Sequence, residues 1–458
     1  MATLSPESTK LIELITSATA SIEKAYASNN QPLPTLGTDG RTPSASDASA
    51  SDRGPGTLPS AELVRAIQLL KGATTQLLAQ LVPPPLYCAE LALSSLDSAA
   101  IGVVAKHRVA DIIHKHDPDA TKGVPISTIA EETGLDSRHL ARVIRSLASK
   151  HVFLELSPDT FTNSRHAAPL RSDTATSCVH AYTHWVWDVL PSASKLDEGL
   201  SDKEHSASFS VAHSGAARAF GGVFWEFLGR EPERGRIFNE AMKEATQHVS
   251  ISESIFEDVP WEEDFGAKNS KGVFVDVGAG AGHQALSVAP KLPGWEFIIE
   301  DLPNVLDSSA KELWTTRGSQ YNYKLVPQNF FEAQSVKGAD VYYMKHIIHD
   351  WPDKESVQIL KHLRDAADVS RTRLLIADII IQPALPPTSD TAPLLANLGG
   401  GASMTHKLDM IMMTLLEAQE RTQAEFEENV LGPAGWKLSK VHYIRSHMRF
   451  AVLECVPI

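Results

Sequence analysis

The sequence predicts an α/β fold whose second half is a doubly wound sheet, with a mainly α-helical region before it. Three observations support this prediction. From Gly272 onward, short apolar runs alternate with helical stretches, which is the order of elements in a sheet of parallel strands with crossover helices. A glycine-rich turn directly follows the first of these runs, and a helix-turn-helix pattern with a hairpin after it precedes them.

The composition indicates a globular chain of two or three domains. The 458 residues are 43% hydrophobic and 21% charged, which is enough apolar material for a sizeable core. The formal net charge of −14 argues against a protein that coats nucleic-acid phosphates. Cys88, Cys178 and Cys455 are far apart and form no CxxC pair, which argues against a disulfide scaffold and fits a reducing compartment.

Neither a targeting segment nor a membrane segment is expected. The first residues, MATLSPESTK, lack a basic segment followed by an apolar one, so no secretory signal is predicted. No uninterrupted run of about 18 apolar residues occurs, so no membrane span is predicted. We therefore expect a cytoplasmic protein.

Residues 1–28 are expected to form an N-terminal helix. Ser5 is a suitable N-cap and Pro6 stands at the first helical position, where its missing N–H costs nothing. Apolar residues follow at helical spacing, namely Leu11, Leu14, Ile15, Ala18 and Ile22. Residues 29–60 are rich in Ser, Pro, Gly, Asp and Thr and contain no aromatic residue, so they are predicted to be a flexible tether.

Residues 61–166 are predicted to contain a winged-helix domain. Ile129 lies on a first short helix, Gly134 at a turn and Leu140 on a second helix, and His151–Phe161 reads as a hairpin. The second helix also carries Arg138, Arg142 and Arg145, which leaves DNA binding open as a function. The acidic net charge and the enzyme-like second half favour a domain that dimerises or covers a substrate site.

Residues 167–262 are expected to be a helical connector that supplies the wall of a substrate pocket. The region is rich in aromatic residues, namely Tyr182, Trp185, Trp187, Phe220, Phe224, Trp225 and Phe227. Aromatic side chains are more often core than ligand contacts, but a group of them between two domains suits a pocket wall. Trp225 and Met242, with Met410 and Met413 further along, are candidates to contact the substrate, although methionine is more often ordinary packing.

Residues 263–458 are expected to form the sheet. Its predicted strands are Val273–Val277, Trp295–Ile299, Ala339–Met344, Leu374–Ala377, Trp436–His442 and Arg449–Glu454. The last two are close enough in sequence for an antiparallel pair. The sheet is therefore predicted to be mixed, with its last strand antiparallel.

The turn after the first strand is predicted to bind a nucleoside. Gly278 and Gly280 let the backbone turn tightly and approach a ligand, and the spacing G-x-G-x-G differs from the dinucleotide pattern G-x-G-x-x-G. Asp276 precedes the turn, and Asp301 ends the next strand, where an acid can accept both ribose hydroxyls. The alternative for Asp301 is a surface acid that caps a helix. No Walker-type lysine follows the turn, which argues against a triphosphate.

The segment MKHIIHDWPD supplies a candidate general base. It follows a predicted strand, so His349 falls at the carboxyl end of the sheet, where open α/β folds bind ligands. An unperturbed histidine titrates at about 6.5 and can accept a proton near neutral pH. The other ring nitrogen needs a carboxylate to orient it. Asp378 and Glu420 are the candidates, and the alternative for Glu420 is an exposed acid at a helix end.

The sequence resembles the S-adenosylmethionine-dependent O-methyltransferases of the caffeic-acid type, and more closely their fungal relatives in aromatic polyketide (sterigmatocystin-like) pathways. The motifs that carry the resemblance are, in order, VDVGAGAG, EDLP, MKHIIHDWPD, IAD and QERT. The resemblance runs from about Ala89 to the end and leaves out the tether. It implies a Rossmann-like class I methyltransferase domain, a winged-helix dimerisation domain and a homodimer in secondary metabolism. It also implies S-adenosylmethionine as cofactor, a small aromatic acceptor and no metal.

The resemblance also implies residue roles. Asp276, Gly278 and Gly280 would hold the methionine part and sugar of the cofactor, Asp301 its ribose, and Asn329 and Phe330 its adenine, with Lys345 nearby. His349 would be the base, oriented by Asp378 and Glu420. His346 stands where relatives often have tryptophan, so the wall of the substrate pocket is expected to differ there.

The expected reaction is methylation of a phenolic hydroxyl whose proton His349 removes. Two alternatives remain open. One is a pseudo-methyltransferase that binds the cofactor and catalyses a pericyclic or elimination reaction. The other is a DNA-binding regulator that uses the arginines of the helix-turn-helix.

Overall fold

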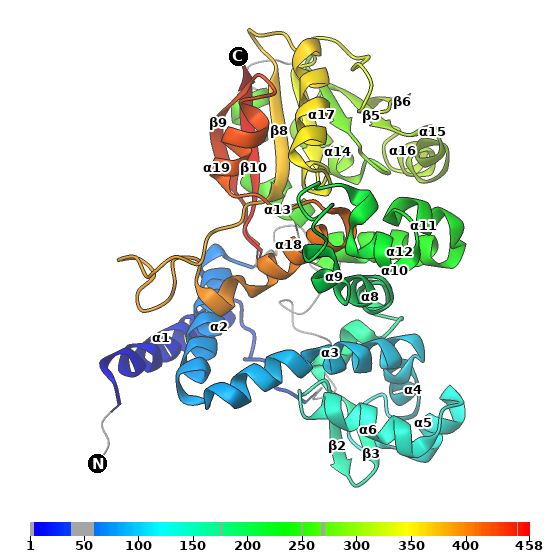
Figure 1. The fold of residues 1–458 in the computed structure, drawn as a ribbon, viewed down its shortest axis with the longest axis vertical. Helices are drawn as coiled ribbons and strands as arrows, with labels where there is room; N and C mark the ends of the chain where they lie inside the picture. Colours follow the sequence, from blue (N-terminus) through cyan, green and yellow to red (C-terminus); the bar gives the residue numbers. More distant parts are fainter. Residues whose placement is uncertain (1–3, 38–58, 175, 249–250, 267–270, 447) are drawn as a thin grey trace. The chain divides into compact units, whose positions relative to one another are not determined.

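The computed structural model describes residues 4–37, 59–174, 176–248, 251–266, 271–446 and 448–458. The chain forms two compact units (Figure 1). The first comprises Met1–Asp202, Ser214–Ser250 and Pro387–Gly401, and the second comprises Lys203–His213, Ile251–Pro386 and Ala402–Ile458. Within the predicted tether, residues 38–58 lie outside the described residues.

The first unit is mainly helical. Its helices are α1 (Pro6–Ser28), α2 (Ala61–Leu81), α3 (Pro84–Lys106), α4 (Val109–His116), α5 (Ile126–Thr133), α6 (Ser137–Ala148), α7 (Val179–His184), α8 (Leu190–Ala193), α9 (Leu196–Leu200), α10 (Gly215–Phe220), α11 (Phe224–Arg230) and α12 (Pro232–His248). Ser5 caps α1 as predicted, because its side chain accepts a hydrogen bond from the Ser8 N–H. The helices α1 and α2 pack against each other, and Leu11 and Ala73 meet Leu394 and Leu398 in a small apolar cluster.

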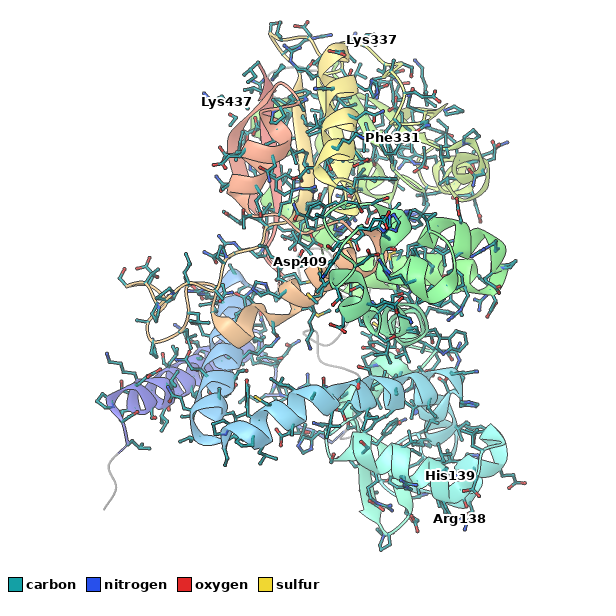
Figure 2. The ribbon with its side chains drawn as sticks, in the orientation of Figure 1. Arg138, His139, Phe331, Lys337, Asp409 and Lys437 are labelled. Atoms are coloured by element: carbon teal, nitrogen blue, oxygen red, sulfur yellow. The ribbon has the colours of Figure 1, made fainter. Side chains whose placement is uncertain are left out.

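The predicted helix-turn-helix and hairpin are present in the first unit. Helices α5 and α6 are joined at Gly134, whose φ of +72° is the left-handed conformation that suits glycine. A three-stranded sheet follows in the order β1 (Val124–Pro125), β3 (Thr160–Asn163) and β2 (Phe153–Ser157). Arg138 and His139 lie on the exposed side of α6 (Figure 2).

Helix α3 bears on the expectation that the chain has no membrane span. Within the described residues, one helix is long and apolar enough to cross a membrane, and it is α3. Glu90 and Asp97 interrupt its apolar run, which is why a search for uninterrupted runs does not find it. A single helix of this kind is weak evidence for a membrane segment, since buried core helices meet the same criterion.

The second unit is built on a seven-stranded mixed sheet, which confirms the predicted α/β class. The strand order is β6-β5-β4-β7-β8-β10-β9. Its strands are β4 (Val273–Val277), β5 (Glu296–Asp301), β6 (Asn322–Pro327), β7 (Val341–Lys345), β8 (Arg373–Ile379), β9 (Trp436–Tyr443) and β10 (Phe450–Pro457). The first five are parallel, and β10 is antiparallel to both β8 and β9. One strand, β6, is absent from the sequence prediction.

Helices cover both faces of this sheet. The helices of this unit are α13 (Ile251–Asp258), α14 (His283–Val288), α15 (Pro303–Val305), α16 (Lys311–Thr316), α17 (Asp353–Ala366), α18 (Ser403–Leu416) and α19 (Gln423–Glu425). On one face, Ile359 and Leu363 of α17 pack against Val275 and Val277 of β4 (Figure 1). On the other face, Trp261 packs against Phe274 of the same strand. Successive side chains of β4 therefore point into apolar layers on opposite faces of the sheet. The carboxyl ends of the parallel strands lie together at one edge of the sheet.

Candidate active site

The glycine turn after β4 forms an open cradle. Gly278 and Gly280 have φ angles of +68° and +58°, a region that side chains with a Cβ rarely adopt. A Cβ at Gly278 would lie 2.7 Å from Ile347 Cδ1, whereas a Cβ at Gly280 would meet no atom of any described residue within 4 Å. The backbone at Gly280 therefore faces free space where a ligand can approach it.

Two acidic residues, Asp301 and Asp276, lie at this turn. The Gly280 N–H donates to Asp301 Oδ2 at 2.7 Å, so the acid at the end of β5 lies against the cradle, as predicted. Asp276 is 3% exposed, and its Oδ2 accepts a weaker hydrogen bond from the Ala285 N–H at 3.3 Å. Burial raises the pKa of Asp301 and raises that of Asp276 to about 7. Both carboxyl groups can accept further hydrogen bonds from a ligand.

Phe330 borders the cradle, and Asn329 shapes the loop beside it. The Phe330 ring would lie 3.4 Å from a Cβ placed on Gly278. Asn329 Oδ1 accepts a hydrogen bond from the Phe331 N–H at 3.1 Å, which fixes the loop after β6. The structure therefore brings together the glycine turn, Asp301 and Phe330, three features that lie on different segments of the sequence.

His349 lies on a short turn, Ile348–Asp350, just beyond β7. Its Nδ1 is 2.9 Å from Glu420 Oε1 and 3.8 Å from Asp378 Oδ1. Its Nε2 is 3.5 Å from Asp350 Oδ1. Glu420, predicted as one of two candidates, is thus the acid that hydrogen-bonds the ring, and Asp378 lies behind it without a hydrogen bond to His349.

The acids around His349 change its proton affinity. Burial by itself lowers the pKa of His349, but the charges of Glu420, Asp378 and Asp350 raise it to about 10. Burial also raises the pKa of Asp350 to about 6. With no acceptor bound, the imidazole is therefore protonated at pH 7 and shares a buried cluster with three carboxyl groups.

His346 lies beside this cluster in a strained backbone conformation. Its φ of +55° is uncommon for a residue with a Cβ. Its ring lies 4.9 Å from the His349 ring and 5.0 Å from the Phe450 ring, and its Nδ1 is 3.8 Å from Asp378 Oδ1. Burial lowers the pKa of His346 well below its ordinary value, so this imidazole is neutral.

Comparisons with known proteins agree with this geometry. Residues 210–437 match the model of the O-methyltransferase domain. An O-methyltransferase of Armillaria gallica is 30% identical over 96% of this chain and 97% of its own length. The chain belongs to the O-methyltransferase family. This enzyme is also 29% identical to 4-O-methyltransferase 1 of Phanerochaete chrysosporium, over 94% of this chain and 95% of that protein. It is 28% identical to the chlorophenol O-methyltransferase of Trichoderma longibrachiatum, over 73% of this chain and 68% of that protein.

Solved structures share the fold. LaPhzM superposes with a TM-score of 0.65 at 25% identity, covering 82% of this O-methyltransferase and 100% of that chain. A structure described as a pericyclic reaction enzyme superposes with a TM-score of 0.70 at 19% identity, covering 98% of this chain and 100% of that one. The second likeness concerns the fold alone.

S-adenosylmethionine is the cofactor of this O-methyltransferase. The residues present fit such a group. The open space at Gly280 admits a ligand close to the backbone, and the Asp301 carboxylate stands beside it to accept hydrogen bonds. Lys345, at the end of β7, is close enough for its charge to lower the pKa of Asp276, against the larger effect of burial.

The structure adds a positioning residue that the sequence analysis does not name. Arg421 is fully buried, and its guanidinium donates to the backbone oxygens of Ile348 and Trp351 at 3.0 and 2.8 Å and to Asp353 at 2.7 Å. It therefore clamps the two ends of the turn that carries His349. The QERT motif was the available signal, because Arg421 directly follows Glu420.

Asp409 fixes the other end of the same motif. Asp409 is labelled in Figure 2. Its Oδ1 accepts a hydrogen bond from the Glu420 N–H at 2.9 Å. Asp409 belongs to α18, which also contacts the turn that carries His349. Glu420 is thus held through its backbone, and its carboxylate is left to meet the imidazole.

The predicted substrate contacts fall on both units. Met410 is exposed and Met413 half-buried on α18, the helix that contacts the His349 turn. Trp225 and Met242 lie on α11 and α12 of the first unit and are both 39% exposed. The described site is therefore built within the second unit, and only Met410, Met413 and His346 of the predicted contacts belong to that unit.

Proposed function

We propose that this O-methyltransferase methylates a phenolic hydroxyl of a small aromatic molecule and that His349 accepts the hydroxyl proton. The observation that carries the proposal is the buried pair of His349 and Glu420, 2.9 Å apart. The His349 turn is linked to the cofactor cradle because Ile347 lies against Gly278. The chlorophenol O-methyltransferase among the relatives acts, by its name, on a phenol, which supports this class of acceptor.

The residues of the chain have separate roles in this reaction. Gly278, Gly280 and Asp301 bind the cofactor. Bound S-adenosylmethionine supplies an electrophilic methyl group on a positively charged sulfur. Glu420 holds the Nδ1–H of His349, so that Nε2 faces the acceptor oxygen and takes its proton as the oxygen attacks. Alignment of this kind contributes about 7–11 kcal/mol and a general base roughly 10²–10⁴-fold in rate.

The direct test is transfer of a labelled methyl group. The purified chain is incubated with methyl-labelled S-adenosylmethionine and a panel of phenols, with the corresponding methyl ethers and alcohols as controls. We expect label in a product whose mass exceeds that of the phenol by one methylene. Products from alcohols but not from phenols would contradict the proposed acceptor class.

The raised pKa of His349 predicts a pH dependence. Only the neutral ring accepts a proton, and the neutral fraction rises about tenfold per pH unit below the pKa. Measured in metal-free buffer, kcat/KM should therefore rise between pH 7 and pH 9. Glu420→Gln removes one of the charges that raise the pKa of His349. The kcat/KM of this variant should therefore rise at a lower pH than that of the wild type. A profile that is the same in both enzymes would exclude this role of the carboxylate.

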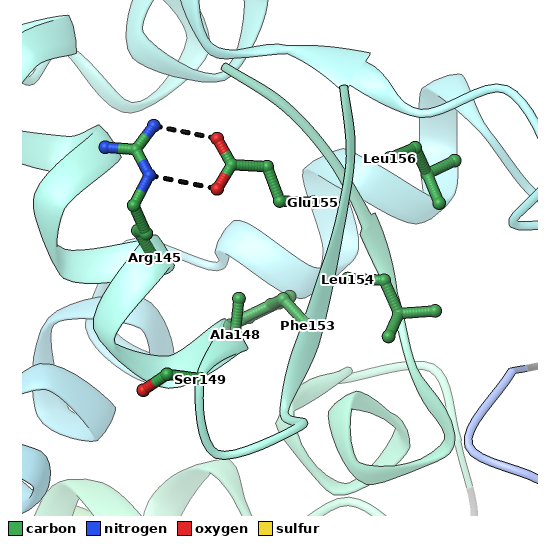
Figure 3. Close-up of a pocket in the computed structure, with 7 residues that line it drawn as sticks. All are labelled: Arg145, Ala148, Ser149, Phe153, Leu154, Glu155 and Leu156. Atoms are coloured by element: carbon green, nitrogen blue, oxygen red, sulfur yellow. Dashed lines mark hydrogen bonds and ion pairs between the residues drawn. The ribbon is translucent and has the colours of Figure 1, made fainter. Parts of the chain in front are cut away.

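The two alternatives give different results in these assays. A pericyclic or elimination enzyme would bind the cofactor and rearrange its substrate without transferring label. A DNA-binding regulator would use the arginines of α6, but Arg145 donates two hydrogen bonds to Glu155, at 2.7 and 2.9 Å (Figure 3). It donates a third to Asp159. These acids offset its charge beside a surface pocket of about 490 Å³ that Ser149 and Leu154 help to line.

The proposal includes a homodimer formed through α3. Within the described part of the chain no side chain from 84 to 99 is buried, and Leu86, Leu91, Leu93 and Leu96 are 52–65% exposed. Burying these side chains in a partner would contribute about 1.5–3 kcal/mol each. Light scattering at micromolar concentration should give twice the mass of one chain, and Leu91→Asp with Leu96→Asp should halve it. A wild-type monomer would refute the dimer.

A further inference from the structure

The base His349 and two side chains beside it form a cluster that the proposed methyl transfer does not fully use. The ligand atoms that His346, His349 and Asp378 offer lie within 4.8 Å of one another. Asp378 Oδ1 is 3.8 Å from Nδ1 of both histidines, which places it between two imidazoles. Asp378 is on β8, whereas the two histidines lie in the segment after β7, so the sequence by itself does not show that all three meet.

Several polar atoms of this cluster are buried without a hydrogen bond. They are Nδ1 of His346, both carboxyl oxygens of Asp378 and Oε2 of Glu420, as judged over the described residues. Asp378 is 0% exposed and Glu420 3% exposed. A buried carboxylate that no group donates to is costly, on the order of 1–3 kcal/mol or more. An additional cation at this point would remove that cost.

The chemistry of the donors selects the kind of cation. Two imidazole nitrogens and one carboxylate oxygen suit borderline divalent ions such as Zn²⁺, whereas Mg²⁺ and Ca²⁺ prefer oxygen donors. His346 Nδ1 is buried and has no hydrogen-bond partner among the described residues, so this nitrogen is available to a metal. Glu420 and Asp350 add negative charge close to the same point.

The spacing is close to that of a zinc site. Zinc bonds of about 2.0–2.1 Å in a tetrahedron place neighbouring donors about 3.3 Å apart. The two separations of 3.8 Å between Asp378 and the histidines exceed this by about 0.5 Å, which small side-chain rotations can supply. His346 has a left-handed backbone conformation, and residues in such strained conformations cluster at ligand sites.

We propose that His346, His349 and Asp378 form a binding site for a divalent ion of the zinc type, which acts as an inhibitor of methyl transfer. A metal on Nδ1 of His349 takes the place of the proton shared with Glu420. A neutral imidazole that is bound to a metal through Nδ1 keeps its proton on Nε2. It then has no lone pair on Nε2 to accept the proton of the acceptor hydroxyl.

Metal binding is tested on the full chain without cofactor or acceptor, so the result does not depend on the proposed function. After removal of metal by a chelator, equilibrium dialysis with Zn²⁺ should give one ion per chain with a Kd in the micromolar range or below. Co²⁺ should give visible absorption bands that Zn²⁺ abolishes. No binding, or binding of Mg²⁺ as tight as that of Zn²⁺, would overturn the proposal.

Variants locate the site. His346→Asn and Asp378→Asn should each weaken Zn²⁺ binding at least tenfold. His442→Asn is the matched control, because His442 belongs to a second cluster with Asp264 and Glu454, where Lys440 and Arg373 already pair with the acids. Loss of binding in the control but not in the first two variants would place the ion elsewhere. Circular dichroism checks that each variant is folded.

Inhibition is a separate readout. If methyl transfer is established, micromolar Zn²⁺ should lower the rate, a chelator should restore it, and His346→Asn should require at least tenfold more Zn²⁺ for the same fractional inhibition. Zn²⁺ that binds at the three residues but leaves the rate unchanged would refute the inhibitory role. Direct binding would then still show the metal site.

Discussion

His349→Ala is expected to lower kcat for methylation by roughly 10²–10⁴-fold, the range for loss of a general base. The variant removes the imidazole that Glu420 holds at 2.9 Å, so the acceptor proton has no protein group to receive it. Binding of S-adenosylmethionine should change little, because the cradle at Gly278 and Gly280 is formed by other segments. Initial rates with a labelled cofactor and calorimetric binding of the cofactor measure the two effects separately.

The same substitution at an exposed histidine provides the control. His139→Ala, on α6 of the first unit, removes a side chain that is 75% exposed and should leave kcat unchanged. If His349→Ala retained the wild-type rate, His349 would not be the proton acceptor. If it lost cofactor binding as well, the ring would serve to build the cradle instead.

Asp301→Ala is expected to raise the Kd of S-adenosylmethionine by about 100-fold. Each hydrogen bond to a charged group contributes about 1.5–3 kcal/mol, and this carboxylate is placed to accept from the ribose. The substitution also removes the bond that Asp301 Oδ2 accepts from the Gly280 N–H, so the glycine turn loses one of its restraints. Isothermal calorimetry with the cofactor gives the Kd directly.

Asp307→Ala is the matched control, since Asp307 is an exposed acid six residues further along the chain. It should bind the cofactor as the wild type does. Asp301→Asn should give an intermediate Kd, because the amide oxygen still accepts one hydrogen bond but carries no charge. Wild-type affinity in Asp301→Ala would remove this acid from the cofactor site and favour its alternative role as a helix cap.

The sequence predicts the buried central strands of the sheet and misses β6, an exposed edge strand. Val273–Val277 is an apolar run except for Asp276 and lies in a central strand, and the structure has a strand with the same bounds. The strand β6 lies at the edge of the sheet, and its alternately exposed residues, NYKLVP, contain no such run. Edge strands bury less side chain, so hydrophobic patterning carries less information about them.

Sequence motifs predict the residues of the site but not their partners. The distance in sequence between His349 and Glu420 is 71 residues, and only the folded chain shows that Glu420 rather than Asp378 bonds Nδ1. Arg421 and Asp409 favour the pairing of Glu420 with His349. Arg421 clamps the turn that carries His349, and Asp409 holds the backbone of Glu420. Neither role follows from patterning, since both depend on contacts between segments far apart in the chain.

By itself, the sequence determined the mixed sheet, the glycine turn after its first strand, and an imidazole at the carboxyl end of another strand. Hydrophobic periodicity and backbone freedom are local properties, so these features can be identified one segment at a time. The tertiary structure alone decided which acid meets His349 and that His346 and Asp378 stand beside it. The residues of these pairs are tens of positions apart in the sequence. The packing of the whole unit determines which of them come into contact.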